Sequence, residues 1–490
     1  MRILLAYPQT PDSFWSFKHV LRLISKKAAF PPLGLLTVAA MLPRDWELLL
    51  VDLNVEPLRD EQIRWADYVM ISAMLVQRAS AEEIARRCGA LGKPVIAGGP
   101  LFTTSHAAFP QIGHFVLGEA EDVIQRLVED MEARSVRACY EAPGRPDISR
   151  VPSPRWDLIE PRHYATMAVQ FSRGCPYDCE FCDIVVMNGR TPRTKSPGQL
   201  IAELEALLQR GWRGMVFIVD DNFIGDRKRT KELLRDLVRW RENTDSLEGF
   251  LTEASLNLAD DPELCDLMVK AGFRKVFVGI ETPSLESLSE CHKLQNQRGD
   301  LLQAVKTLQR AGMQVMGGFI VGFDSDPHDI FERQFEFIQR SGVVTAMVGL
   351  LTALPKTRLY QRLLTEGRIV AESSGNNTQA ALNFTPRLDR GFLESGYREL
   401  MTRLYEPKAY YQRIRTFLQE YRPATQRLGL SLRDLVTVLK SLWLLGIRQT
   451  GRSLYWRLLW STLLRRPRQL RHAIELAILG HHFRRVAAAL

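Results

Sequence analysis

The stretch Phe171-Ser172-Arg173-Gly174-Cys175-Pro176-Tyr177-Asp178-Cys179-Glu180-Phe181-Cys182 decides how the rest of the sequence is interpreted. Its three cysteines are separated by three and then by two residues, directly after an apolar run that reads as a strand. Thiolates are the usual ligands of iron–sulfur clusters, and a loop of this length can place three sulfurs on three irons of a [4Fe–4S] cube. The fourth iron is then open to a ligand. Zinc and purely structural thiols are the alternatives, but no fourth Cys or His follows nearby to complete a zinc site.

Around this loop the sequence alternates apolar runs with helical segments. Strands separated by helices form parallel sheets, and ligands bind at the carboxyl ends of their strands. We therefore predict a partial (β/α)6 barrel over residues 163–375. Its expected strands are Met167–Phe171, Met215–Val219, Phe250–Ala254, Lys275–Ile280, Val315–Val321 and Thr345–Leu351.

The residues before the barrel show a second alternating series, which predicts a Rossmann-like, doubly wound domain over residues 1–140. A Pro-rich linker is expected over 141–162, and a mostly helical region, with breaks near Pro423 and Pro467, over 376–490. The fold class is therefore α/β, in three parts. The expected strands of the first domain are Arg2–Ala6, Trp46–Leu53, Tyr68–Met74, Pro94–Gly98 and His114–Gly118.

Composition places the chain among folded globular proteins, since 46% of its 490 residues are hydrophobic and 25% are charged. Seven cysteines are too few for a disulfide scaffold, which favours a reducing, cytoplasmic location. No apolar run is long enough to span a bilayer, and the first residues lack the features of a signal peptide. Charge is uneven: thirteen Arg and Lys against two acidic residues give residues 421–490 a net charge of +11, which leaves −2 for the rest.

The cysteine loop, with Phe181 before the last cysteine, resembles the radical S-adenosylmethionine superfamily. Three further motifs follow at successive strand ends, as in that family: Asp220-Asp221-Asn222, Gly279-Ile280-Glu281-Thr282-Pro283-Ser284 and Gly318-Phe319-Ile320-Val321-Gly322. The first stands where the family often has Gly-Gly-Glu, which binds the methionine amino group. The resemblance implies that Cys175, Cys179 and Cys182 hold the cluster. It implies S-adenosylmethionine contacts for Asp220, Asp221, Asn222, Gly279, Glu281, Ser284, Gly318, Ile320 and Gly322.

The chemistry that this resemblance implies is radical chemistry. The methionine end of S-adenosylmethionine chelates the open iron, and an electron from an external donor cleaves the sulfonium. The resulting 5′-deoxyadenosyl radical removes a hydrogen atom from an unactivated carbon. The protein's share is positioning and exclusion of water.

The first domain resembles the cobalamin-binding domain of class B radical methylases. Small residues at its strand ends let a flat macrocycle approach the backbone, and a degenerate domain without ligand is the alternative. The Asp-x-His-x-x-Gly motif that supplies a histidine to cobalt is absent, and the neighbours of His19 do not fit it, so no cobalt ligand is named. The implied cobalamin residues are Ser72, Gly98, Gly99, Gly118 and Glu119.

Two segments, Ser13–Lys18 and Lys26–Leu35, resemble a subgroup that includes hopanoid C-2 methylases. The function implied is methyl transfer to an unactivated carbon of a hydrophobic small molecule or lipid. A radical cyclase or rearrangement enzyme, and a cofactor sensor without catalysis, are the alternatives. A tRNA methylthiotransferase would need a second three-cysteine cluster, for which the first domain offers only Cys88 and Cys139. Nucleic acid is accordingly not an expected partner.

The basic carboxyl-terminal region combines Arg with Leu and Trp. Its apolar stretch Leu435–Ile447, which contains Lys440 and Trp443, is too short to span a bilayer, and Trp456 and Trp460 alternate with arginines. This pattern is typical of a helix that lies on an anionic membrane surface. A helical cap packed on the barrel, and contact with RNA or a protein, are the alternatives.

Overall fold

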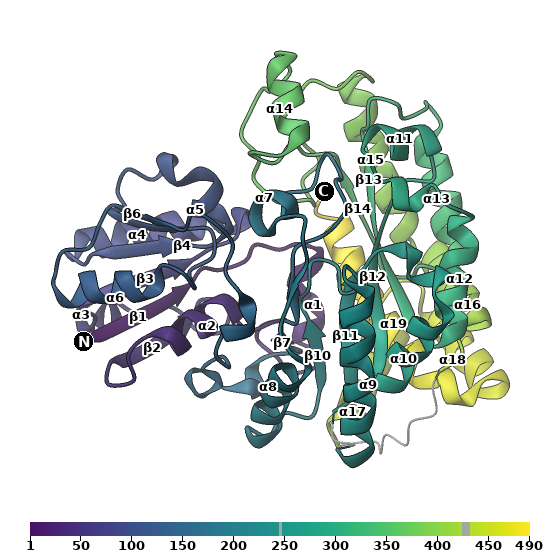
Figure 1. Ribbon diagram of the computed structural model, residues 1–490. Helices are drawn as coiled ribbons and strands as arrows, with labels where there is room; N and C mark the ends of the chain where they lie inside the picture. Colours follow the sequence, from purple (N-terminus) through teal and green to yellow (C-terminus); the bar gives the residue numbers. More distant parts are fainter. Residues whose placement is uncertain (245–246, 424–431) are drawn as a thin grey trace.

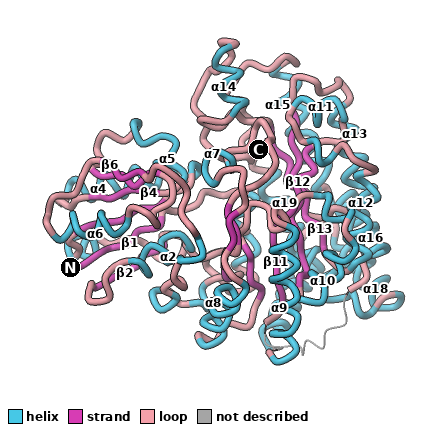
Figure 2. The backbone as a smooth tube through the Cα atoms, viewed as in Figure 1, coloured by secondary structure: helices cyan, strands magenta, loops and turns pink. Residues whose placement is uncertain are grey.

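The protein is described by a computed structural model over residues 1–244, 247–423 and 432–490, and it contains two separate parallel sheets (Figures 1 and 2). The amino-terminal domain, at the left of Figure 1, has the strand order β2-β1-β3-β4-β5-β6. All five predicted strands of this domain are confirmed, and a sixth short one is added at the edge. The strands are β1 (Arg2–Tyr7), β2 (Glu47–Asp52), β3 (Tyr68–Ser72), β4 (Val95–Gly98), β5 (His114–Leu117) and β6 (Cys139–Glu141).

The helices of this domain cover both faces of its sheet. Apolar side chains of the central strands are fully buried, so the sheet is the core of this domain. The chain turns sharply after β4, where Gly99 has φ 89°. That conformation favours glycine. The main helices are α2 (Leu33–Met41), α4 (Arg78–Ala90), α5 (Pro100–Ser105) and α6 (Ile124–Glu132).

The second sheet is the predicted open barrel, with the order β14-β13-β12-β11-β10-β7 and every pairing parallel. All six expected strands are present: β7 (Met167–Val169), β10 (Met215–Ile218), β11 (Gly249–Ala254), β12 (Phe273–Glu281), β13 (Gln314–Val321) and β14 (Ala346–Leu350). Helices cover the outer face, from α8 at the lower middle of Figure 1 to α12 and α13 on the right: α8 (Pro197–Gln209), α9 (Arg227–Asn243), α10 (Pro262–Ala271), α12 (Leu301–Ala311) and α13 (Ile330–Ser341).

Burial alternates along the barrel strands. Val216 and Ile218 of β10 are fully buried, on the side of the covering helices, whereas Phe217 points to the inner face. On β12, the partly exposed Phe277 and Gly279 alternate with the fully buried Val276, Val278 and Ile280. The inner face of the barrel is therefore the accessible one.

The segment expected as an extended linker, residues 141–162, packs against the amino-terminal domain. Trp156 is buried, and the amide of Arg155 donates to the carbonyl of Leu36 at 3.1 Å. The segment contains short 3-10 turns, including Ile148–Arg150 and Trp156–Leu158. Apolar residues between the prolines explain the difference, because they bury surface that a free linker would expose.

The carboxyl-terminal region is helical, as expected, and packs against the rest of the chain. Nε2 of His482 on α19 lies 3.2 Å from the carbonyl oxygens of Ser13 and Phe14 in the loop after β1. Lys440 Nζ on α17 donates to the carbonyl of Leu23 at 3.2 Å. Within the described residues, no helix is long and apolar enough to cross a membrane. Taken here from the end of β14, this region begins with α14 (Arg358–Thr365), which falls within the range expected for the barrel. The other helices are α15 (Arg390–Tyr405), α16 (Pro407–Glu420), α17 (Leu432–Trp443), α18 (Arg452–Arg465) and α19 (Leu470–Ala487).

Candidate active site

The three cysteines of the decisive motif lie on one loop beyond the carboxyl end of β7. The loop starts at β8 (Ser172–Arg173), which pairs with β9 (Arg193–Thr194), and it runs into α7 (Ile184–Asn188). All three thiols are free and only partly buried. Gly174 has φ 100°, and a Cβ there would lie 2.9 Å from the carbonyl oxygen of Thr191, so this position requires glycine.

Polar groups surround the sulfurs. Nδ2 of Asn222 lies 3.8 Å from Sγ of Cys175, and Nε2 of Gln295 lies 3.8 Å from Sγ of Cys179. Burial raises the pKa of the Cys175 thiol, so its thiolate gains from such donors. No three Cys, His, Asp or Glu side chains within the described ranges converge as they would on one metal ion. Three free thiols, two of them with an amide donor beside the sulfur, suit the ligand set of an iron–sulfur cluster.

Asp220, Asp221 and Asn222 follow β10 and contact the cysteine loop. Asp220 is buried and accepts from the amide of Phe171 at 2.8 Å and from the hydroxyl of Ser172 at 2.7 Å. Burial raises its pKa to about 7. Asp221 accepts from the amide of Gly174 at 2.7 Å. Both carboxylates therefore brace the start of the loop.

The residues predicted at the ends of β12 and β13 lie on the same side of the barrel. Glu281 has φ 67°, which is uncommon for a residue other than glycine, and its Oε1 pairs with the buried Nζ of Lys293 at 2.7 Å. A Cβ at Gly279 would lie 2.7 Å from that Nζ, so glycine makes room for the pair. Ser284 caps α11 (Leu285–Glu290). On β13, Gly318 faces Phe277, Ile320 is partly exposed, and Gly322 donates to Asp326 at 2.7 Å.

The five predicted cobalamin residues line one cavity of about 260 Å³ at the carboxyl edge of the first sheet: Ser72, Gly98, Gly99, Gly118 and Glu119. Four residues from the barrel side complete its lining: Gln170, Arg173, Met187 and Asn188. The cavity therefore lies between the first domain and the cysteine loop. It can take a flat ligand on backbone and small side chains.

Glu119 joins the two domains. Its carboxylate accepts from Arg173 at 2.7 Å and from Arg193 at 2.7 Å, and the three side chains are largely buried. Arg173 also pairs with Glu121 at 2.7 Å. Glu119 thus lies at the border of the cavity. Its carboxylate already accepts hydrogen bonds from Arg173 on β8 and Arg193 on β9, the paired strands that flank the cysteine loop.

Sequence reasoning missed Glu253, which is on β11 in register with Phe277 and so points to the inner face of the barrel. Burial, with the negative charge of Asp221 as the smaller cause, raises its pKa to about 8. It is therefore mostly protonated at neutral pH. A single Glu within a strand carries no local signal of this position.

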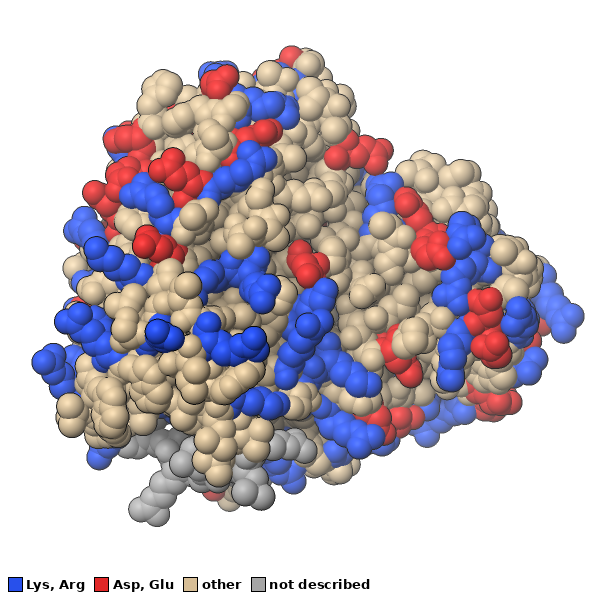
Figure 3. Space-filling view, turned by 180° about the vertical axis from the view of Figure 1, so that it is seen from behind, with Lys and Arg blue, Asp and Glu red and all other residues tan. Residues whose placement is uncertain are grey.

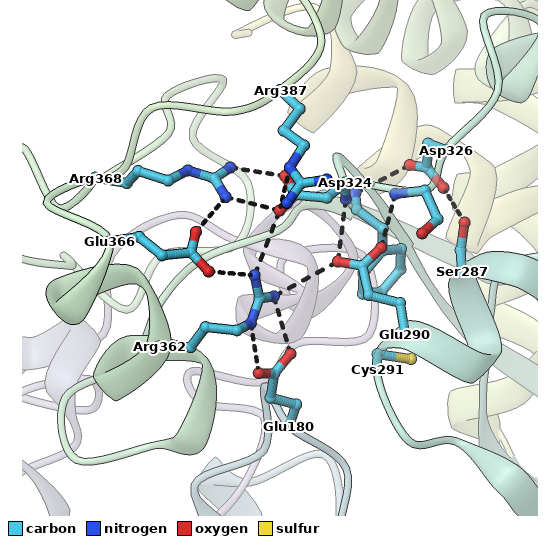
Figure 4. A network of polar contacts seen from close by, with 12 residues as sticks. Glu180, Ser287, Glu290, Cys291, Asp324, Asp326, Arg362, Glu366, Arg368 and Arg387 are labelled. Carbon is cyan, nitrogen blue, oxygen red and sulfur yellow. Dashed lines mark hydrogen bonds and ion pairs between the residues drawn. The ribbon is translucent and has the colours of Figure 1, made fainter.

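Sequence reasoning also missed a charge network beside the cysteine loop, shown in Figure 4. Arg362 of α14 donates to both oxygens of Glu180, at 2.7 Å and 3.0 Å, and contacts Asp324 at 3.3 Å. Arg368 also binds Asp324, and although burial opposes it, these arginines hold the pKa of Asp324 below its usual range. Glu290 accepts from the amides of Asp324 and Ser325. The network ties the loop between Cys179 and Cys182 to the carboxyl-terminal region.

Three family models match successive parts of the chain. The B12 binding domain matches residues 21–128, the radical SAM superfamily matches 169–338, and a domain of unknown function (DUF4070) matches 357–490. The chain thus joins a B12 binding domain to a radical SAM domain, the combination that the cavity and the cysteine loop display. Its cofactors are a [4Fe–4S] cluster, S-adenosylmethionine and cobalamin.

Two relatives are similar to this chain over nearly its whole length. An uncharacterized methyltransferase of Synechocystis sp. is 41% identical over 99% of this chain and 91% of its own length. The hopanoid C-2 methylase of Rhodopseudomonas palustris is 34% identical over 98% of this chain and 92% of its own. The chain belongs to the family of cobalamin-dependent radical S-adenosylmethionine methyltransferases.

Solved structures support the fold. The cobalamin-dependent radical enzyme OxsB superposes with a TM-score of 0.65 at 14% identity, covering 100% of this chain and 79% of that one. The methyltransferase TsrM from Kitasatospora setae gives a TM-score of 0.62 at 15% identity and covers all of both chains. Both likenesses extend over the three parts of the molecule.

Proposed function

We propose that this enzyme transfers a methyl group to an unactivated carbon of a hydrophobic small molecule or lipid, of the polycyclic, hopanoid-like type. The observation that carries the proposal is the position of the cavity, which opens between Gly98-Gly99 and the cysteine hairpin. Bound there and at the loop, the cofactors supply a transferable methyl group and the radical that removes a hydrogen atom from the substrate carbon. In this proposal the protein holds the cavity of the first domain and the cysteine loop next to each other.

The residue roles are part of this proposal. Cys175, Cys179 and Cys182 hold the cluster, while Asn222 and Gln295 donate to two of their sulfurs. Glu281, through Lys293, and the ends of β12 and β13 form the wall that receives S-adenosylmethionine. Asp220 and Asp221 have a positioning role, because they accept hydrogen bonds from the amides of Phe171 and Gly174 and so hold the start of the cysteine loop in place. Gly98, Gly99 and Gly118 leave room for the corrin beside Ser72.

The hydrophobic substrate is supported by the inner face of the barrel. Val219, Phe277 and Ile320 keep partial exposure there, and Trp15 packs on Phe277 with ring centroids 5.1 Å apart. Glu253 is the carboxyl on this face, and its protonated state keeps the surface uncharged at neutral pH. The name of the 34%-identical relative, a hopanoid C-2 methylase, points to the same substrate class.

The location and the electron source complete the proposal. We place the enzyme in the cytoplasm, because every one of its seven cysteines is a free thiol. A one-electron donor outside the chain reduces the cluster. A hopanoid-like substrate resides in the membrane, so the enzyme meets it at the inner membrane surface.

Anaerobic reconstitution with iron, sulfide, cobalamin and S-adenosylmethionine tests the function. Mass spectrometry should find S-adenosylhomocysteine and 5′-deoxyadenosine formed together, with one methyl added to a saturated polycyclic triterpenoid. Ala at any one of the three cysteines should abolish 5′-deoxyadenosine, whereas Cys265→Ala, a buried thiol on α10, should not. Formation of 5′-deoxyadenosine with a rearranged but unmethylated product would contradict methyl transfer.

A further inference from the structure

The helices α17 and α18 expose an unusual amount of apolar surface. Nine of the fourteen exposed large hydrophobic side chains among the described residues lie within residues 435–464. Trp460 is 58% exposed and Leu464 is 79% exposed. We call this surface the α17–α18 face; its apolar members are Leu435, Val436, Leu439, Trp443, Ile447, Trp456, Trp460, Leu463 and Leu464.

The two helices of the face are joined by the π-helical turn Leu444–Arg448, which contacts both of them. The hydroxyls of Ser441 on α17 and Tyr455 on α18 are 3.0 Å apart. Nε1 of Trp456 donates to the carbonyl of Gly446 at 3.0 Å, so this indole closes the turn between the helices. Exposed apolar residues recur every four positions on α17, at Leu435, Leu439 and Trp443, and the next in this series, Ile447, lies in the π-helical turn that follows. That spacing keeps them on one side of the helix.

Basic side chains interrupt and border the α17–α18 face. No acidic residue occurs from 435 to 474, while eight Lys and Arg do. Arg448 stacks over Trp443 with its guanidinium carbon 4.8 Å from the ring centroid. The lower left of Figure 3, where α18 and α17 lie, is accordingly tan and blue with little red. The exposed arginines of this segment are Arg448, Arg452, Arg457, Arg465, Arg468 and Arg471.

We propose that the α17–α18 face docks the enzyme on an anionic lipid bilayer. Leu, Ile and Trp side chains beside arginines combine burial of apolar area with attraction to negatively charged headgroups. Tryptophan favours the boundary between headgroups and acyl chains. A second copy of the chain fits less well. In a two-fold contact the face would meet itself, and its charged residues, which are all basic, would repel one another.

Docking here leaves the active site open. Figure 1 places α17 and α18 at the lower end of the molecule and the cysteine loop, next to α7, toward the upper end. Lys440 anchors α17 to Leu23 and Ser25, so the face is fixed to the body of the enzyme. The inference deepens the proposed membrane location, yet no side chain of this face takes part in the proposed methyl transfer.

Co-sedimentation of the full-length protein tests the inference. Vesicles of pure phosphatidylcholine are compared with vesicles containing one third phosphatidylglycerol, at low and at high salt. We expect at least ten-fold stronger binding to the anionic vesicles, weakened by salt because surface charges are screened. The double variant Trp460→Ser/Leu464→Gln should lose at least ten-fold in binding. The control Val370→Gln, which alters a side chain 57% exposed elsewhere, should bind as the parent does.

Two further readouts keep the outcome clear. Indole fluorescence should shift to the blue on addition of anionic vesicles in the parent, and less so in the double variant. Negligible binding to both kinds of vesicle would overturn the inference, as would a parent dimer that the double variant dissociates. Methylation of detergent-dispersed substrate should be unchanged in the double variant, and its loss in that variant alone would contradict a role confined to docking. No methylation by the parent, with vesicle binding intact, would contradict the proposed function and not the docking.

Discussion

Arg173 and Glu119 form a largely buried ion pair, 2.7 Å apart, across the boundary between the two sheets. Arg173 stands two residues before Cys175, the first of the three proposed cluster ligands, and Glu119 borders the cavity of the first domain. This pair therefore joins the cavity of the first domain to the cysteine loop of the barrel.

Breaking this pair should destabilise the domain boundary. Glu119→Gln leaves Arg193 and Arg173 without their shared charge partner, and losing one member of a buried pair costs about 3 kcal/mol. We expect thermal unfolding a few degrees lower and weaker retention of cobalamin on gel filtration. Arg64→Gln, which removes an exposed pair 3.9 Å long, is the control and should change neither. A double variant with Arg173→Gln that is fully additive would show that the two residues do not act together.

Gly99 should control access to the cavity. A Cβ there would lie 2.7 Å from Oγ of Ser72, and the backbone has φ 89°. Gly99→Leu should therefore abolish cobalamin binding, measured by absorbance after reconstitution, while iron content stays at the parent level. At Gly113, in the same domain, an added Cβ would meet no atom within 4 Å, so Gly113→Leu is the matched control. Unchanged cobalamin in the Gly99 variant would rule out this cavity as the corrin site.

Arg362 should stabilise the cluster loop from the carboxyl-terminal region. Its two hydrogen bonds to Glu180 hold the chain between Cys179 and Cys182. Arg362→Met should lower iron content at least two-fold and hasten cluster loss in air, and Arg362→Lys should fall between, since lysine cannot donate both bonds in the same plane. Arg387→Met is the control, because Arg387 is 69% exposed and meets only Asp324 of this network, at 3.5 Å. Equal iron in all variants would contradict the role.

Glu253 should impose a pH dependence on stability. Its pKa of about 8 lies above the unfolded value, so the folded state binds the extra proton, and stability falls as pH rises from about 4.5 to about 8. Glu253→Gln removes this loss. The variant should lose fewer degrees in melting temperature than the parent between pH 6 and pH 9. If the melting temperatures of the two proteins fell by the same amount between pH 6 and pH 9, the pKa of Glu253 would not be raised in the folded state.

The strands of both sheets could be predicted from the sequence because each is a short apolar run between turn residues. The exception is β6, three residues from Cys139 to Glu141, which has a single buried side chain, Tyr140, and so lacks a pattern. The cysteine loop was recognisable because its three cysteines are close in sequence. The residues that contact it from elsewhere were not: Gln295 and Arg362 come from segments more than 100 residues later, and only folding brings them to the loop.

Some residues that were predicted to contact a cofactor also make hydrogen bonds to other protein groups. Glu119 was expected to contact cobalamin because of its place after β5, yet two arginines occupy its carboxylate. Asp220 and Asp221 follow the strand that the family uses for the methionine amino group, and both bond to the cysteine hairpin. Strand order fixes which edge a residue reaches. It does not decide which neighbour its side chain meets there.

The loop after β1 has a consequence for how this architecture can be recombined. Trp15 from the first domain stacks on Phe217 of the barrel, and the carbonyls of Ser13 and Phe14 face His482 near the end of the chain. One short segment thus interlocks all three parts of the molecule. A chimera with a cobalamin domain from another enzyme would lose these contacts, unless the loop after β1 and α19 were taken from that same enzyme.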